Sequence, residues 1–246
     1  KPSDYFETLL STGDGGSQTF TGLDFQPDWV WSKRRQTHVH QLYDSVRTAG
    51  SGKALQSDSD AAEGGDGGTY GYLSSFTSNG FASTAGSSNN NYFNTSGGTY
   101  VFWNWKAGTA LNNSAGANGG SIATTGSISS TSGFGIVKYV GTGSNATIYH
   151  GLGKIPKMII TKNIDQSFHW SVYTFHSNTK ILRLNGTNAE ATESAFQSTD
   201  PTSTLKPVRL LSYIDQFSVF AVPFKRIKAG LKPRYIKFPS AFPFPV

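Results

Sequence analysis

The chain has 246 residues, which suits one large domain or two ordinary ones. It contains no cysteine, which excludes disulfides, and no apolar run approaches the roughly 18 residues of a membrane-spanning helix. The net charge of +6 is local, because six basic residues follow Phe224 and no acidic residue follows Asp215. No signal peptide is recognisable, and the chain begins with Lys1 rather than Met, so we expect a processed product or a fragment.

The first 108 residues predict a β-sandwich. Short apolar runs at residues 8–10 and 18–20, separated by a Gly-rich turn, are typical of strands. Pro27 precedes three apolar residues, 29–31; proline favours the first position of a strand, and an unbroken apolar run indicates burial on both faces. Further strands are expected at residues 41–44 and 100–106. The Gly-, Ser- and Asn-rich segments 57–71 and 83–98 predict long surface loops.

The pattern of residues 21–33 returns at residues 150–162. Both copies place three apolar residues two positions after a proline, and four further identities align without a gap: Gly22, Leu23, Pro27 and Lys33 with Gly151, Leu152, Pro156 and Lys162. Internal repeats of this kind indicate duplicated structural units. The sequence therefore predicts an all-β protein of two tandem β-sandwiches, resembling jelly rolls or lectins.

The second β-sandwich is expected over residues 134–225. Strands are predicted near residues 135–140, 158–160, 170–173, 181–184 and 217–222, and one short helix at residues 188–196. Residues 109–133 are polar and rich in Gly, Ser and Thr, and we interpret them as a linker with weak strand potential at residues 121–122.

The last segment, residues 226–246, is basic and rich in Pro and Phe. It lacks the backbone donors of a central strand, so we expect an extended arm. Burial of Phe238, Phe242 and Phe244 on a neighbouring chain would explain its apolar residues, because exposed apolar stretches usually mark contacts. A disordered end is the alternative. We favour pairing of the basic residues with a neighbouring subunit over binding to nucleic acid.

Metal and cofactor sites have weak signals. His38 and His40 would share one face of a strand, but no third ligand is obvious. The acidic residues of the 57–71 loop do not follow the calcium-loop spacing, so a solvated loop is favoured over a calcium site; they are Asp58, Asp60, Glu63 and Asp66. His150 replaces Thr21 of the first copy, which favours a local hydrogen bond. We expect no cofactor and no metal.

Catalytic motifs are equally weak. The chain has no nucleophile elbow, no phosphate-binding loop and no closely spaced carboxylate pair on one strand. The aspartates Asp24, Asp28, Asp44, Asp165 and Asp215 are scattered singly. We therefore expect no enzyme activity.

Aromatic residues offer two kinds of surface. Trp103 and Trp105 share one face of their predicted strand, and core packing explains them better than sugar stacking. The aromatic residues of the predicted loops are better candidates for a surface contact: Tyr70, Tyr72, Tyr92 and Phe93.

Several long motifs resemble a repeat domain of virion proteins from marine tailed phages. The first copy carries SDYFETLLSTGDGG, FQPDWVWSK, LYDSVR and WNWKAG, and the second carries HGLGKIPKMIITK, WSVY and LRLNGT. The resemblance covers residues 3–108 and 134–187. It implies a tail-fibre, tail-associated or capsid-appended structural protein with β-sandwich domains, and it transfers no catalytic residue.

From these observations we expect a non-enzymatic virion protein on the particle exterior. Its expected partners are further copies of itself, as a trimer or another oligomer, other virion proteins and a host cell-surface glycan. No membrane partner is expected. The competing interpretation is a carbohydrate-binding module or a glycan-active enzyme domain.

Overall fold

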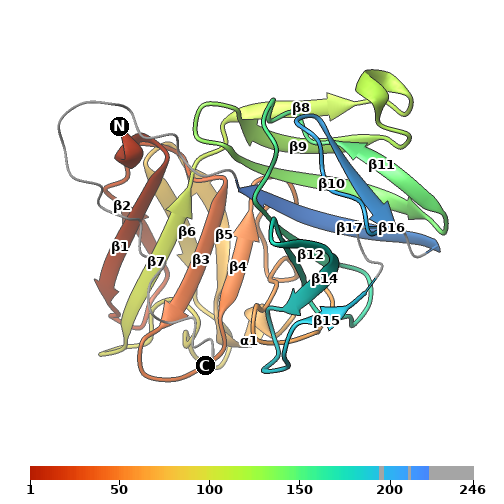
Figure 1. Cartoon of the computed structure of the whole chain (residues 1–246). Helices are drawn as coiled ribbons and strands as arrows, with labels where there is room; N and C mark the ends of the chain where they lie inside the picture. The colour runs from red at the N-terminus through yellow and green to blue at the C-terminus, as the bar shows by residue number, and fades with distance from the viewer. Residues whose placement is uncertain (194–196, 210–211, 222–246) are drawn as a thin grey trace.

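The fold is all-β, as the sequence predicts (Figure 1). The structure is a computed structural model that describes residues 1–193, 197–209 and 212–221, with side chains described as far as residue 208. Within these ranges the strands form antiparallel sheets, and three short helical turns accompany them: η1 (Pro2–Asp4), α1 (Gly67–Tyr70) and η2 (Ala117–Gly119). No helix in the described ranges is long and apolar enough to cross a membrane.

The N-terminal part of the chain forms two sheets. The first has four strands in the order β1 (Phe6–Thr12), β7 (Thr99–Trp105), β3 (Trp29–Arg34), β4 (Gln41–Asp44). The second has three strands in the order β2 (Gln18–Thr21), β6 (Gly80–Thr84), β5 (Tyr72–Thr77). We call these strands the first repeat.

The C-terminal part also forms two sheets. The larger has eight strands in the order β15 (Ala191–Thr192), β14 (Ser177–Arg183), β13 (Ser171–Thr174), β12 (Met158–Asn163), β17 (Ser212–Ala221), β10 (Phe134–Thr142), β9 (Thr124–Ser129), β8 (Thr109–Asn113). The smaller pairs β11 (Asn145–Tyr149) with β16 (Leu205–Arg209). We call strands β10 to β17 the second repeat.

The two repeats share one topology. The order β1-β7-β3-β4 in the first corresponds to β10-β17-β12-β13 in the second. The register agrees as well: Trp29 lies opposite Trp105 and Asp44, and Met158 lies opposite Ala221 and Thr174. The sequence repeat is therefore also a structural repeat. Pro27 lies two residues before β3, and Pro156 lies two residues before the equivalent strand, β12.

Three apolar clusters lie between the sheets. One contains the aromatic residues packed between the two sheets of the first repeat, such as Phe81 and Phe102. A second, with Ile148 and Ile159, fills the second repeat between its large and small sheets. The third contains residues of both repeats and joins them: Trp29, Trp31, Leu42, Leu55, Ala107, Phe134, Ile136, Ile160, Ile164, Trp170 and Val172. We call this third cluster the junction.

The proline-preceded strands β3 and β12 connect these clusters. In β3, Val30 points into the core of the first repeat, while Trp29 and Trp31 point into the junction. In β12, Ile159 points into the core of the second repeat, while Ile160 points into the junction. Successive side chains of a strand point to opposite faces, so an unbroken apolar run serves two cores at once. This confirms the predicted burial on both faces.

The 109–133 segment is not a plain linker, which corrects the sequence-based interpretation. It forms β8 and β9, which extend the large sheet beyond β10. β8 and β9 consist mostly of small polar residues, so their composition resembles that of a linker. One small residue of β9 is nevertheless required by the geometry. A Cβ atom at Gly126 would lie 2.2 Å from the carbonyl oxygen of Ile136, so only glycine allows this close approach.

The helix predicted at residues 188–196 is also wrong over its described part. Residues 191–192 form β15 against β14, and residues 194–196 lie outside the described residues. Two glutamates of this segment reach across to β14, where Glu190 pairs with Lys180 and Glu193 with Arg183.

We predict that Ile159→Ala lowers the free energy of unfolding by about 2–5 kcal/mol, because Ile159 is fully buried and its loss leaves a cavity. Leu10→Ala is the matched control, since Leu10 is 71% exposed and its truncation should cost less than about 0.5 kcal/mol. Urea unfolding followed by tryptophan fluorescence measures both. Equal effects of the two substitutions would contradict the assignment of β12 to the core.

Candidate functional site

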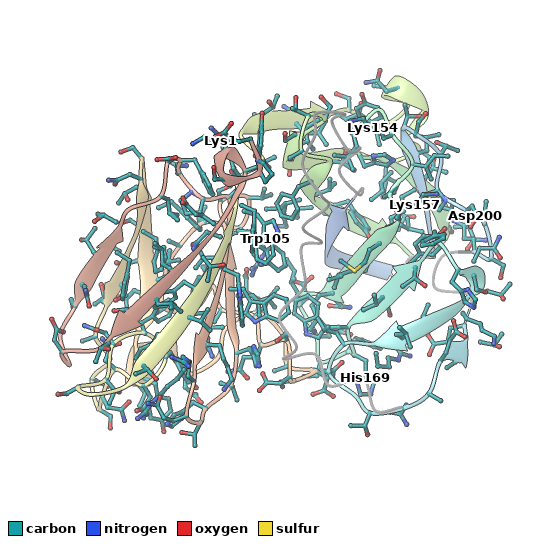
Figure 2. The ribbon with its side chains drawn as sticks, turned by 60° about the vertical axis from the view of Figure 1, so that its left-hand side comes forward. Lys1, Trp105, Lys154, Lys157, His169 and Asp200 are labelled. Carbon is teal, nitrogen blue, oxygen red and sulfur yellow. The ribbon has the colours of Figure 1, made fainter. Side chains whose placement is uncertain are left out.

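The junction between the repeats combines apolar packing with hydrogen bonds that connect distant segments of the described chain. Trp105 lies at the boundary between the two halves of the molecule (Figure 2), and its ring stacks on Phe134 with centroids 6.1 Å apart. Trp31 and Trp103 meet edge to face at 6.0 Å. The Trp-rich face of β7 is therefore packing surface, as the sequence favoured.

Asp28 ties three segments together at one end of the junction. Its Oδ2 atom accepts a hydrogen bond from the Ala107 amide at 2.9 Å. Its Oδ1 atom accepts from the Ser45 hydroxyl at 2.5 Å and from the Ser127 hydroxyl at 3.1 Å. Ser127 belongs to β9, so this buried carboxylate links the first repeat to the sheet of the second.

The acidic 57–71 loop of the first repeat is held by the second repeat. The indole Nε1 of Trp170 donates to the carbonyl oxygens of Gln56 and Ser59, at 2.9 and 3.1 Å. The Lys162 ammonium donates to the carbonyl of Asp60 at 3.0 Å, and the Glu63 amide donates to the carbonyl of Ile164. The loop makes these contacts through its backbone groups and not through its carboxylates.

Lys162 occupies the same repeat position as Lys33, and the two lysines act alike. Lys33 donates to the carbonyls of Thr37 and His38, directly after β3. Lys162 donates to the carbonyls of Asn163, the last residue of β12, and of Gln166 in the loop that follows. Burial lowers the pKa of both lysines, that of Lys162 to about 8. The lysine shared by both sequence copies thus closes the loop that follows its strand.

A buried ion cluster lies at the end of β4. Arg47 donates through Nε to Asp44 at 2.6 Å and through Nη1 to Glu63 at 2.8 Å, and Lys53 pairs with Glu63 at 3.0 Å. Complete burial raises the pKa of the Asp44 carboxyl, and the Arg47 charge works against that rise. Two carboxylates are thus brought together, but by a shared guanidinium that occupies both.

The surface-contact prediction needs correction at Tyr92 and Phe93. Phe93 is 0% exposed and Tyr92 is buried, and both belong to the core of the first repeat. Tyr70 and Tyr72 are half-buried and pack against that same core.

Hydrogen bonding explains this burial. Residues 85–98 form a loop that packs onto the first repeat, where the Asn90 and Asn94 side-chain amides both donate to the carbonyl of Gly16. The hydroxyl of Tyr100, on β7, donates to the carbonyl of Asn91 and so holds the same segment against the sheet.

The histidines and acidic residues do not assemble a metal site in the described ranges, where no group of three His, Cys, Asp or Glu side chains is placed to hold an ion. His38 and His40 lie in the loop after β3 and not on a strand, which corrects that expectation. The His40 Nδ1 atom accepts a hydrogen bond from the Trp31 indole at 2.8 Å. The Asp58 carboxylate accepts one from the His40 amide.

Exposed apolar side chains mark surfaces that the sequence reading missed. Phe175, in the turn between β13 and β14, is 67% exposed, and Ile155 is 48% exposed. The ammonium of Lys157 lies 5.1 Å from the centre of the Phe175 ring. The predicted contact residues Phe238, Phe242 and Phe244 lie outside the described residues.

His150 is fully buried and makes the local hydrogen bonds that the sequence favoured. Its Nδ1 atom accepts from the Leu152 amide at 3.3 Å, and its Nε2 atom lies 3.2 Å from the carbonyl oxygen of Thr202. Burial lowers the pKa of this imidazole to about 4. The folded protein therefore holds His150 neutral at pH values where an exposed histidine is protonated.

We predict that Trp170→Phe lowers the free energy of unfolding by about 1–3 kcal/mol, because two part-buried carbonyls, those of Gln56 and Ser59, lose their donor while an apolar ring remains. Hydrogen exchange should also accelerate around these two residues. Trp105→Phe is the matched control, since it changes the same side chain at the junction and leaves both loop hydrogen bonds in place. Equal exchange rates in the two variants would contradict the assigned role.

We predict that His150 makes stability depend on pH. The pKa of His150 is lower in the folded protein than in the unfolded chain, so the unfolded chain binds the proton first as the pH falls. The free energy of unfolding is therefore unaffected by His150 above about pH 6.5 and decreases by about 3 kcal/mol as the pH drops to 4. Urea unfolding at pH 7, 5.5 and 4 measures this. The His150→Gln variant should show a shallower loss over the same range, and parallel profiles would contradict the prediction.

No curated protein sequence and no solved structure matches this chain. One family model matches residues 1–215, which include the first repeat, the junction and most of the second repeat. The family description is that of a domain of unknown function, and its span includes Asp28, Lys33, Lys162 and Trp170. The chain therefore belongs to the DUF7483 family, a domain of unknown function.

Proposed function

We propose that this protein is a non-enzymatic structural component on the exterior of a phage particle: a tail fibre, a spike or a capsid decoration. The observation that carries the proposal is the apolar junction, which fuses two copies of one fold into a single body. The resemblance of the sequence motifs to virion repeat domains supports the same assignment. In this proposal the two repeats are tandem β-sandwiches related to lectin-like jelly rolls.

Stiffness is the property that the junction supplies. Domains joined by small polar contacts move relative to one another by default, whereas a large apolar interface holds them in place. Here eleven buried residues from both repeats form one cluster. The Asp28 hydrogen bonds and the contacts to the 57–71 loop are directional, so they also fix the relative orientation of the packed segments. A component that projects from a particle requires such resistance to bending.

Contact with other molecules would come from the surfaces that the fold leaves open. In this proposal the C-terminal arm assembles copies of the chain, as a trimer or another oligomer, and connects them to other virion proteins. A host glycan would be met by the half-buried rings of Tyr70 and Tyr72. A carbohydrate-binding module is the competing function, and it predicts a monomer with sugar affinity.

Native mass spectrometry and a glycan array together distinguish these functions. A stable oligomer that binds no glycan, or binds one through an assembled particle surface, supports the structural role. A monomer with sugar affinity would overturn it in favour of a binding module.

We predict that replacing Phe238, Phe242 and Phe244 by Ser in the full chain shifts the oligomer towards monomer, because their apolar surface would no longer be buried between chains. Light scattering after size exclusion measures the mass at several concentrations. The matched control replaces the same residues by Leu, which keeps them apolar and should preserve the oligomer. An unchanged mass in the Ser variant would contradict the role of the arm.

A further inference from the structure

We propose that the outer edge of β1 pairs with β1 of a second copy of the chain, so that the four-stranded sheets of two first repeats join into one antiparallel sheet. β1 is the outermost strand of its sheet (Figure 1). The equivalent strand of the second repeat is not outermost, and this difference carries the proposal. It goes beyond the proposed function, because it requires neither a virion nor a glycan.

β10 is the strand of the second repeat that corresponds to β1. Phe6 lies opposite the last residue of β7, and Phe134 lies opposite the last residue of β17. From there each strand pairs over seven residues without a shift in register. Thr8 of β1 therefore corresponds to Ile136 of β10.

In the second repeat this edge is occupied by β9. Ile136 lies opposite Ser127, and a Cβ atom at Gly126 would lie 2.2 Å from the Ile136 carbonyl oxygen, so the two backbones are in close contact. In the first repeat the described residues place no strand beside Thr8, because β1 pairs with β7 alone. Within the described ranges, the same edge is thus paired in one copy of the fold and unpaired in the other.

Alternate residues of β1 present their backbone groups to this edge. The Lys106 amide donates to the Tyr5 carbonyl and the Gly13 amide donates to the Gly98 carbonyl, so the odd-numbered residues from 5 to 13 bond to β7 and its continuations. The even-numbered residues direct their amides and carbonyls outward: Phe6, Thr8, Leu10 and Thr12. These are the donors and acceptors that a further antiparallel strand requires.

The opposite edge of the same sheet is closed within the chain. There the amide of Leu42, on β4, donates to the carbonyl of Leu55 at 2.8 Å, and the Leu55 amide donates back to the Leu42 carbonyl at 3.0 Å. Of the two edges of this sheet, the described residues therefore leave that of β1 for another chain.

β1 lacks the features by which proteins usually prevent pairing between edge strands. It contains no proline and no lysine, and its uninterrupted register with β7 shows no bulge. Its one charged residue is Glu7, whose carboxylate is held within the repeat, because Oε2 accepts a hydrogen bond from the Asp24 amide at 3.3 Å. Leu10 is 71% exposed. An exposed leucine on an unprotected edge strand favours pairing with another chain.

A second copy is the occupant that fits, because β1 is complementary to itself. Two β1 strands related by a two-fold axis at Leu9 run antiparallel and pair over all seven residues, with Thr8 of one copy opposite Leu10 of the other. Glu7 then lies opposite Ser11, so no like charges meet. The two Leu10 side chains are diagonal neighbours on one face, where each removes apolar surface of the other from water.

Single cysteines test both the pairing and its register, because the chain has no cysteine of its own. In the full chain, Leu9→Cys should form an intermolecular disulfide under mild oxidation, since the Cβ atoms of directly opposed residues lie about 4.5–5.5 Å apart. The matched control is Thr12→Cys, which is exposed on the same strand but about 20 Å from its own copy in this register. Non-reducing electrophoresis and peptide mass mapping report both. Rapid cross-linking at position 9 with little at position 12 supports the proposal, and equal rates, or no cross-link at position 9, overturn it.

A surface substitution gives a second test that leaves the core of the first repeat unchanged. Leu10→Lys should raise the dissociation constant of the dimer about tenfold or more, because two ammonium groups replace two leucines that contact each other. Phe175→Lys is the matched control, since Phe175 is 67% exposed and lies on the second repeat, and the constant should not change. Sedimentation equilibrium at several concentrations measures both. A parent chain that stays monomeric, or an oligomer that persists unchanged in Leu10→Lys, overturns the proposal.

Discussion

The packing of two equivalent strands against one shared core is the constraint on which the rest of the structure depends. In both β3 and β12, alternate apolar residues point into the core of their own repeat and into the junction. Trp31 therefore contributes to the same cluster as Ile160, its counterpart in the other copy. Because the apolar run of each strand is divided between the two faces, neither strand can shift register without exposing apolar surface in two places.

Polar groups reinforce the junction where apolar packing ends. Lys162 and the Trp170 indole donate to backbone carbonyls of the first repeat, and Asp28 accepts from the Ser127 hydroxyl of β9. Buried polar groups are costly when unpaired, so contacts of this kind discriminate against alternative arrangements of the two repeats. The same reasoning explains why Lys33 and Lys162 occur in both copies: each satisfies the carbonyls of a loop that would otherwise be left without donors.

Much of the fold could be predicted from apolar alternation and from the repeat, which locate β1, β2, β3 and β12 within a few residues. β8 and β9 escaped because Gly, Ser and Thr are as common in linkers as in small-residue strands, and only the pairing with β10 distinguishes them. The burial of Tyr92 and Phe93 could not be predicted, because an Asn-rich composition is typical of solvent-exposed loops. In the structure the side-chain amides of Asn90 and Asn94 donate hydrogen bonds to the carbonyl of Gly16. Contacts between residues a hundred positions apart, such as Trp170 with Gln56, leave no local signal.

The place of β8 and β9 moves the effective boundary between the two repeats. These strands follow the first repeat in sequence but belong to the large sheet of the second. A fragment starting at residue 134 would turn β10 from an interior strand into an open edge, with unpaired amides and carbonyls available to any neighbouring chain. Recombination that exchanges such repeats would therefore preserve a foldable product only if its crossover falls before Thr109.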